Sequence, residues 1–578
     1  MATSLACGRV WSKMFLKKPR SVCLAEEKEG KLERNLSLID LLAIGIGGTV
    51  GSGVFVLTGL IARDYAGPGV VWSWLISGFG CCFSAMSYAE MSCRIPSAGS
   101  SYAYVYHALG ELPAVLAAWC LCLEYGVSGA AVARSWGEKV DKWTDIIGVP
   151  VWKPLDPGLG VNVFAAALQA VCVGLLLVGV EMGKLTVNFF TILKMLLVTF
   201  MIVAGLCLFK ADNVSNWAPK GASGILRGAT SAFFGYLGYD EVCCLAAEAK
   251  DPHVTLPRAV FGTICTVSVL YALASLALVG MMPYDEISRD SGFSDAFKDR
   301  DWYWAQHIVA AGEIVTLPLV VLISFLAQPR LQFAMAEDGL LPSIFSEVDK
   351  GGNLRKGIIF SGVVCTLIAL FIPFTYLDDM ISAGVLLSFN LTNSSLIAVR
   401  RVNLSNPGRC KSLLVAYNVL AFVGAMLLNY CDLGSPEVVA PGVVVFLVIY
   451  VAYSIATTCP EADDPWKDIQ YRVPYMPFCP LFGIFVNYFL VAQLAWWGLL
   501  MIFGYFAIGI TFYLIYGIHN SVGNKNGWVS LLKRSREHFF EENNGAMSSL
   551  EEQLIRKYLV SEDIVDDDHH YSTTHVDT

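Results

Sequence analysis

The first long apolar segment of the chain, residues 38–60, is rich in glycine. It reads LIDLLAIGIGGTVGSGVFVLTGL and has glycine at positions 45, 47, 48, 51, 53 and 59. The segment is long enough to cross the ~30 Å hydrocarbon core of a bilayer. Each glycine, however, costs roughly 0.8–1.0 kcal/mol relative to alanine inside a helix. The sequence therefore predicts a membrane helix that breaks near Gly47 to Gly53.

A helix break at membrane depth leaves backbone N–H and C=O groups without partners. Such groups are tolerated only where protein or a water-filled cavity satisfies them. Many secondary transporters build a site for a small charged solute from broken helices near the middle of the membrane. The segment therefore favours a transporter.

The composition is that of a membrane protein. Hydrophobic residues make up 55% of the 578 residues and charged residues 15%, whereas soluble domains have about 25% charged residues. Apolar runs near membrane-spanning length recur along the chain, which predicts an all-α integral membrane protein with about 14 transmembrane helices. The runs are 38–60, 70–93, 112–133, 160–181, 185–209, 224–247, 259–282, 303–329, 358–374, 378–398, 412–431, 437–457, 480–502 and 504–518.

The distribution of lysine and arginine predicts the topology. These residues concentrate in the segments that face the cytoplasm when the N-terminus is placed there, as the positive-inside rule expects. An even number of spans then puts both termini in the cytoplasm. Residues 1–37 are basic and lack the apolar core of a cleavable signal peptide. Asn213, in an Asn-Val-Ser triplet of an outer loop, is a predicted glycosylation site.

The sixth apolar run is interrupted by glycine as well, at Gly235 and Gly238. It lies five spans after the first, which suggests two inverted five-helix repeats, each led by a broken helix (helices 1 and 6). The expected organisation is a cytoplasmic N-terminal segment (1–37), an inverted-repeat transport core of spans 1–10 (38–400), spans 11–14 (401–518) and a cytoplasmic tail (519–578).

The two predicted breaks together describe a binding site for a zwitterion. Three consecutive N–H groups at Gly51, Ser52 and Gly53 would begin a half-helix, and with the helix dipole they suit a carboxylate. The alternative is close helix packing through small residues. Carbonyls freed near both breaks suit an α-ammonium group, so an α-amino acid fits between them. These carbonyls belong to Ile46, Thr49, Phe234, Gly235 and Leu237.

Four further side chains are candidates for the site. Phe234 and Tyr236 are positioned to close over a substrate as a gate, or simply to pack. Glu124, deep in the third span, costs roughly 2.5–3.5 kcal/mol on insertion scales unless it is paired or faces water. It would favour a cationic side chain, or make a structural hydrogen bond. Lys194, in the fifth span, either couples proton binding to transport or bridges carbonyls of span 1 in place of a sodium ion.

Several ordered segments resemble the amino acid–polyamine–organocation superfamily and, within it, the cationic amino acid transporter family. The superfamily signature is SYAEMSCRIPSAGSSYAYVYHALGE (87–111). The family segments are LEYGVSGAAVARSW (123–136), FFGYLGYDEV, AEAKDPHVTLPRAV (247–260) and AQPRLQFAMAEDGLLP (327–342). VPYMPFCPLFGIFVNYFLVAQL (473–494) and FYLIYGIHNS (512–521) resemble the extra C-terminal pair of spans of that family. The resemblance covers spans 1 to 14 in order.

The resemblance implies alternating access in an inverted-repeat fold. It places the carboxylate site on Ser52 and Gly53 with Thr49 nearby, and the amine and gate positions on Phe234, Gly235 and Leu237. Glu124 aligns with the acid of span 3 in the family. Lys194 aligns with a lysine common in bacterial, proton-coupled members. Animal members usually lack this lysine and are uniporters, so uniport and proton symport both stay open.

The function predicted from the sequence is transport of cationic amino acids such as lysine, arginine and ornithine. The alternatives are a proton-coupled symporter of neutral amino acids and an amino acid sensor; a channel or an enzyme is disfavoured. The expected partners are the amino acid, the lipid bilayer and, for symport, protons, with no nucleic acid. The 17 cysteines show no metal-ligand spacing, and no cofactor is expected. The plasma membrane is favoured, with the vacuole or another endomembrane as the alternative.

Overall fold

The protein is built from α-helices. This computed structural model describes residues 13–19, 22, 36–51, 53–97, 99–146, 160–178, 184–246, 249–289, 292–349, 353–403, 406–430, 439–461, 471–526 and 528. Within these ranges no strand forms, and two isolated β-bridges are the only strand-like pairings. Most of the two predicted cytoplasmic ends lies outside the described residues. The predicted all-α class is confirmed.

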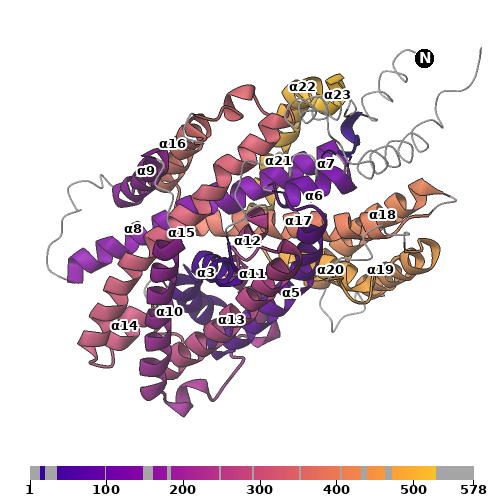
Figure 1. Ribbon diagram of the computed structural model, residues 1–578. Coiled ribbons are helices and arrows are strands. Elements are labelled where there is room, and N and C mark those ends of the chain that lie inside the picture. Colours follow the sequence, from indigo (N-terminus) through magenta and orange to yellow (C-terminus); the bar gives the residue numbers. More distant parts are fainter. Residues whose placement is uncertain are drawn as a thin grey trace, which may run out of the picture.

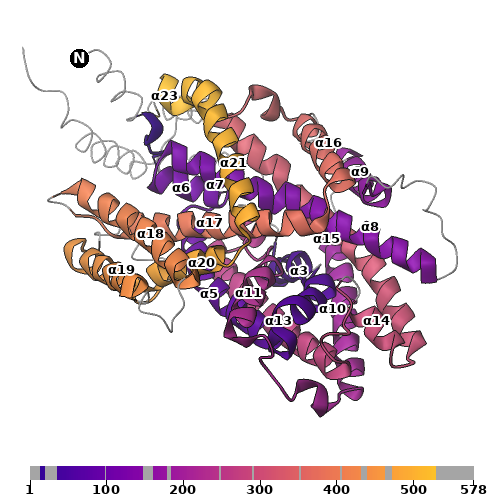
Figure 2. The same cartoon turned by 180° about the vertical axis from the view of Figure 1, so that it is seen from behind.

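Each predicted span corresponds to one helical stretch (Figures 1 and 2). Nine of the described stretches are long and apolar enough to cross a membrane, and the first of them, Leu38–Arg94, contains two predicted spans. In chain order the spans are α3 (Leu38–Thr49) with η1 (Gly53–Leu57), α4 (Thr58–Leu60) and η2 (Ile61–Ala66); α5 (Val70–Arg94); α7 (Glu111–Cys122) with η4 (Leu123–Val127) and α8 (Ser128–Ile146); α9 (Val163–Val178); α10 (Lys184–Cys207); α11 (Gly221–Phe234) with α12 (Glu241–Cys244); α13 (Pro252–Met281); α15 (Tyr303–Glu337); α16 (Arg355–Phe371); α17 (Phe374–Arg400); α18 (Pro407–Tyr430); α19 (Val439–Thr458); α20 (Phe478–Ala492); and α21 (Trp496–Phe512) with η9 (Tyr513–Gly517) and α22 (Ile518–Asn520). The shorter connecting elements are η3 (Gly67–Gly69), α6 (Ser101–Ala108), η5 (Ala211–Val214), α14 (Gly292–Lys298), η7 (Ser343–Phe345) and α23 (Val522–Asn526).

The boundary between the last two spans differs from the prediction. The sequence placed it after residue 502, whereas α20 ends at Ala492 and α21 begins at Trp496. Ala495 is extended, with φ −61° and ψ 140°, and turns the chain. Apolar residues continue on both sides of this turn, so hydropathy alone does not reveal it. The fourteenth helix is correspondingly longer than predicted.

Both predicted helix breaks are present. The helix α3 begins with a capping box between Ser37 and Asp40 and ends at Thr49, after which Val50 is extended (φ −73°, ψ 97°). The chain becomes helical again at Gly53. In the sixth span α11 ends at Phe234 and α12 begins at Glu241.

The contacts between helices agree with two inverted repeats. Exchanging spans 1–5 with spans 6–10 turns most contacts of the core into other contacts that are also present. The contact of α3 with α13 corresponds to that of α11 with α5, and α10 with α3 corresponds to α17 with α11. The pairs α5 with α13 and α9 with α16 map onto themselves. Because each repeat has an odd number of spans, the second repeat enters the membrane from the opposite side.

The last four spans are added to one side of this core. In both views α18 and α19 lie at the edge opposite α9 and α16 (Figures 1 and 2). Helix α20 packs against α17 and α5. In this interface the buried amide of Asn487 donates to Ser84 Oγ at 3.0 Å and to Asn390 Oδ1 at 2.9 Å. Polar bonds thus fix the position of α20 on the core.

Candidate functional site

The two helix breaks touch each other through their backbones. A Cβ atom on Gly53 would lie 2.7 Å from the Cα of Gly235. A Cβ atom on Gly238 would lie 2.9 Å from the backbone nitrogen of Thr49, and Gly238 has a φ of +109°, which favours glycine. The glycines are therefore required by this approach of two backbones, and the predicted halves of the site are brought together.

The predicted carboxylate site lies at the start of the second half of span 1. Gly51 is buried and Gly53 begins η1, whose first N–H groups have no carbonyl of a preceding turn to bond. Helix continues from Gly53 to Ala66, so its positive end faces the break. Ser52 lies outside the described residues.

The predicted amine site is partly occupied by bonds within the protein. The N–H of Leu237 donates to the carbonyl of Phe234 at 3.2 Å. The hydroxyl of Tyr271, on α13, lies 3.0 Å from the carbonyl oxygen of Gly235 and 2.9 Å from that of Thr49. Each carbonyl has a second lone pair for a ligand. The sequence analysis missed Tyr271, which joins the two breaks.

Replacing Tyr271 with phenylalanine is expected to lower uptake. The change removes the one O–H donor that the two buried carbonyls share, and an unsatisfied buried group costs about 1–3 kcal/mol, or roughly tenfold in kcat/KM. The measurement is initial-rate amino acid uptake, normalised to the amount of protein in the membrane. Tyr236→Phe is the matched control, because the Tyr236 hydroxyl donates instead to the carbonyl of Trp74, at 2.8 Å. Equal losses in the two variants would contradict a special role for Tyr271.

The two predicted gate residues have different surroundings. Phe234 packs edge to face on Phe374 of α17, with ring centroids 5.6 Å apart. Tyr236 is bonded to span 2 and packs between Trp74 and Tyr271. Both side chains are nearly fully buried, and the gate stays a prediction for each.

Glu124 lies in a buried group of acids. It is 1% exposed and belongs to η4, in the middle of span 3. Its carboxyl interacts electrostatically with Asp240 and Glu241, which follow the second break. A side-chain hydrogen bond links Glu124 with Asp240, and the backbone of Gly238, Asp240 and Glu241 also acts on the Asp240 carboxyl. The structure therefore joins Glu124 to Asp240, a pairing that the sequence analysis did not predict.

Lys194 reaches the first helix break from span 5. The side chain is fully buried, and its Nζ donates to the carbonyl of Gly47 at 2.7 Å. One turn earlier, Thr191 Oγ1 donates to the carbonyl of Ala43 at 3.0 Å. Lys194 thus bonds one carbonyl of span 1, and both predicted roles, bridging and proton coupling, stay predictions.

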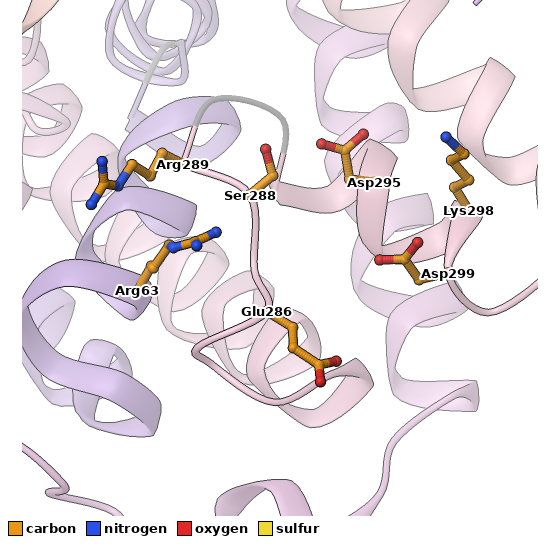
Figure 3. A pocket seen from close by; sticks show the side chains of 7 residues that line it. All are labelled: Arg63, Glu286, Ser288, Arg289, Asp295, Lys298 and Asp299. Carbon is orange, nitrogen blue, oxygen red and sulfur yellow. The ribbon is translucent and has the colours of Figure 1, made fainter.

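A charged pocket lies elsewhere, on the side predicted to face outward (Figure 3). It encloses about 580 Å³ and is lined by Arg63, Glu286, Ser288, Arg289, Asp295, Lys298 and Asp299. The lining holds three acidic and three basic residues, so it has no preference for one sign of charge. Arg63 comes from η2 of span 1 and the other lining residues from the connection between spans 7 and 8, so the pocket does not include the helix breaks.

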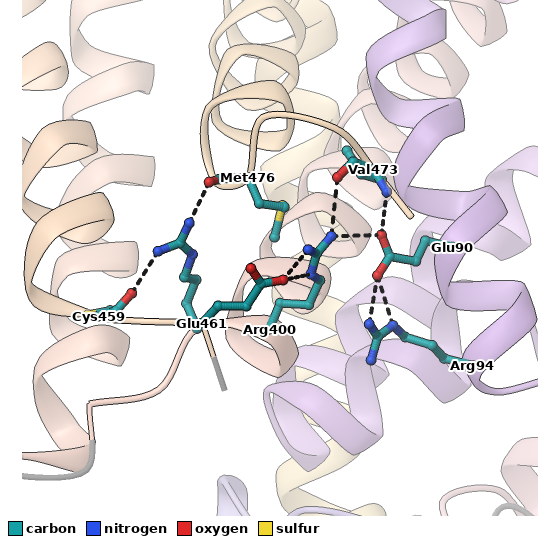
Figure 4. Close-up of polar contacts among 8 residues, drawn as sticks. Glu90, Arg94, Arg400, Cys459, Glu461, Val473 and Met476 are labelled. Atoms are coloured by element: carbon teal, nitrogen blue, oxygen red, sulfur yellow. Dashed lines mark hydrogen bonds and ion pairs between the residues drawn. The ribbon is translucent and has the colours of Figure 1, made fainter. Parts of the chain in front are cut away.

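A second charged cluster holds the opposite side of the core together (Figure 4). Glu90 of α5 bonds Arg94 at 2.8 Å, Arg400 of α17 at 3.1 Å and the backbone N–H of Val473 at 2.7 Å. Arg400 is also paired with Glu461. These bonds tie spans 2 and 10 to the segment before α20, and every charge has a partner, so the cluster is structural.

The remaining predicted sites concern glycosylation and metal binding. Asn213 lies in η5, and its Nδ2 donates to the carbonyl of Gly280 at 2.9 Å; glycosylation stays a prediction. Among the described residues no group of three His, Cys, Asp or Glu side chains could hold a metal ion.

Comparison with known proteins gives matches along most of the chain. The family described as "Amino acid permease" matches residues 36–485, and the one described as "C-terminus of AA_permease" matches residues 471–521. "Cationic amino acid transporter 3, mitochondrial" of Arabidopsis thaliana is 36% identical over 64% of this chain. "Cationic amino acid transporter 4" of Mus musculus is 29% identical over 86% of this chain and 89% of its own length. "Methylthioribose transporter" of Bacillus subtilis (strain 168) is 33% identical over 68% and 86%. The matched part spans 63% of the Arabidopsis protein.

Proposed function

Because this chain belongs to the amino acid permease family, and within it to the cationic amino acid transporter family, we propose that it carries lysine, arginine and ornithine across a membrane by alternating access. The observation that carries the proposal is the contact of two broken helices through Gly53 and Gly235, close to the buried acids Glu124 and Asp240. Membership of a transporter family also supports the prediction that this protein is not an enzyme.

The backbone at the breaks would bind the groups that all α-amino acids share. The substrate carboxylate bonds the N–H groups from Gly51 to Gly53, at the positive end of a half-helix. The α-ammonium donates to carbonyls of Phe234, Gly235 and Leu237, with Thr49 beside it. Phe234 closes the outer side of this site.

The cationic side chain would be recognised by Glu124 and Asp240. Two carboxyls side by side in a buried place repel one another when both are charged. A lysine or arginine side chain between them removes this repulsion and donates charged hydrogen bonds to the carboxyls. A neutral side chain does neither, so the pair favours cationic substrates.

Glu124→Gln is expected to weaken lysine transport selectively. A hydrogen bond to a charged group contributes about 1.5–3 kcal/mol, so the KM for lysine should rise roughly tenfold or more. The KM for leucine should stay close to that of the wild type. Uptake of the two labelled amino acids by the same proteoliposomes measures both values, with Glu124→Asp as the charge-conserving control. Equal losses for lysine and leucine would assign Glu124 a structural role.

The membrane potential would drive this transport if it is uniport. A monovalent cation gains about 2.3 kcal/mol per 100 mV, which corresponds to roughly 50-fold accumulation. Uptake of radiolabelled lysine into proteoliposomes, with leucine as competitor, tests the proposal when potential and pH gradient are imposed separately. Uptake driven by the potential alone, with leucine a much weaker competitor than unlabelled lysine, is the expected result.

Proton-coupled transport of neutral amino acids is the second candidate. The observation that favours it is the buried lysine, Lys194, on the first break. Under this alternative lysine uptake needs the pH gradient and is competed by leucine. We further propose that both termini lie in the cytoplasm, from the distribution of basic residues, and that the protein lies in the plasma membrane, with the vacuole or another endomembrane as the alternative.

A further inference from the structure

The chain ahead of the first span is anchored on the side predicted to face the cytoplasm. Residues 13–19 are bonded there to α6, the short helix between spans 2 and 3. The N–H of Lys18 donates to the carbonyl of Tyr106 at 3.3 Å, and the Lys18 ammonium pairs with Asp338, at the end of α15, at 2.7 Å. Lys18 is 6% exposed, so these bonds are shielded from water. The preceding residue, Lys17, therefore has a defined place on this side of the protein.

Lys17 faces a second lysine, Lys411 of α18, and no acid. Burial and the positive charge of Lys411 lower the pKa of Lys17 to about 8. Besides Lys411, the thiol of Cys410 is the one described group that acts on the Lys17 ammonium. In the part of the chain that the structure describes, neither lysine makes a hydrogen bond or an ion pair. Two ammonium groups held close together repel one another, so an anion is missing from this place.

Lys411 lies at the end of an apolar face that α18 turns to the lipid. Residues four positions apart lie on one side of a helix, so Lys411 shares a side of α18 with Val415 and Val419. These two valines are 64% and 56% exposed. Helix α18 lies at the edge of the molecule (Figures 1 and 2), so acyl chains contact this valine face. Lys411 is exposed as well and lies about 6 Å beyond Val415, at ~1.5 Å per residue, on the way to the headgroups.

We infer that Lys17 and Lys411 bind the phosphate of an anionic phospholipid in the cytoplasmic leaflet, with its acyl chains along Val415 and Val419. A phosphate ester accepts charged hydrogen bonds from both ammonium groups and removes their repulsion. Anionic lipids are concentrated in the cytoplasmic leaflet, and basic pockets beside membrane helices on that side bind their headgroups. A soluble phosphate has the same charge, but it makes no use of the apolar face next to Lys411. The inference rests on the predicted topology and is independent of the proposed substrate.

The test measures lipid binding to the purified full-length protein in detergent. The probe is dioctanoylphosphatidylserine, a water-soluble anionic lipid, and it is compared with dioctanoylphosphatidylcholine and with glycerophosphoserine, which has the serine headgroup without acyl chains. The variants are Lys17→Gln, Lys411→Gln and the two combined. Lys356→Gln is the matched control, because Lys356 is an exposed lysine on the same predicted side that is already paired with Glu347.

Each single variant is expected to bind phosphatidylserine about fivefold more weakly and the double variant about 25-fold, the effect of one lysine and of two near an anionic surface. Lys356→Gln should bind as the wild type does. Lys411→Arg should keep most of the affinity, which separates a lost charge from misfolding.

Three results would overturn the inference. The first is wild-type affinity in the double variant, and the second is equal affinity of the wild type for phosphatidylcholine and phosphatidylserine. The third is glycerophosphoserine binding as tightly as the lipid, which would assign a soluble anion to the two lysines instead. Failure of the wild type to carry lysine would refute the proposed substrates alone, because lipid binding is measured without transport.

Discussion

Replacing Gly53 with alanine is expected to abolish uptake. The added methyl group would lie 2.7 Å from the Cα of Gly235 and 3.1 Å from the Tyr271 hydroxyl. No side-chain rotation relieves an overlap with backbone, so the two half-helices must separate. In enzyme sites a misplacement of ~1 Å costs about 100-fold in rate, and we expect a loss of at least that size here.

The control for this variant is Gly174→Ala. Gly174 lies in α9, and a Cβ atom there meets nothing within 4 Å. Replacing a helical glycine by alanine stabilises a helix by roughly 0.8–1.0 kcal/mol, so this variant should transport normally. Uptake is measured with the amount of folded protein in the membrane determined for both variants. Normal transport by Gly53→Ala would refute the backbone contact as the centre of the site.

The sequence predicted those parts of the fold that depend on local composition. The length of each apolar run predicts a span, and the six glycines of the first run predict its break. Both features can be read from a short segment of sequence. The end of α20 at Ala492 was predicted wrongly, because apolar residues continue through the turn at Ala495. A local pattern cannot show where a uniformly apolar run bends.

The contacts that assemble the site depend on positions far apart in the sequence. Tyr271 bonds the carbonyl of Thr49 across 222 positions, and a tyrosine in an apolar span has no local feature that predicts this bond. Glu124 was recognised because acids are costly in a membrane, but its neighbour Asp240 became evident only from the packing of span 3 on the second break. Residue type thus identified Glu124 as a candidate site residue, whereas its pairing with Asp240 depends on the three-dimensional fold.

Replacing Lys194 with methionine is expected to lower uptake strongly and to leave the pH profile unchanged. Methionine keeps an unbranched side chain but removes the ammonium that donates to the carbonyl of Gly47 at 2.7 Å. A hydrogen bond from a charged group contributes about 1.5–3 kcal/mol, so uptake should fall roughly tenfold to 100-fold. Thr191→Val is the matched control, since it removes a neutral bond to Ala43 from the same helix.

The pH profile separates the two roles of Lys194. A bridging ammonium holds the inner half of span 1 in every step of the cycle, so its loss lowers transport equally at all pH values. A coupling lysine must release its proton during the cycle, so its replacement would abolish the response to an imposed pH gradient. We expect the first result because the ammonium is bonded directly to a carbonyl beside the break. A wild type driven by the pH gradient and a Lys194→Met variant indifferent to it would instead establish proton coupling.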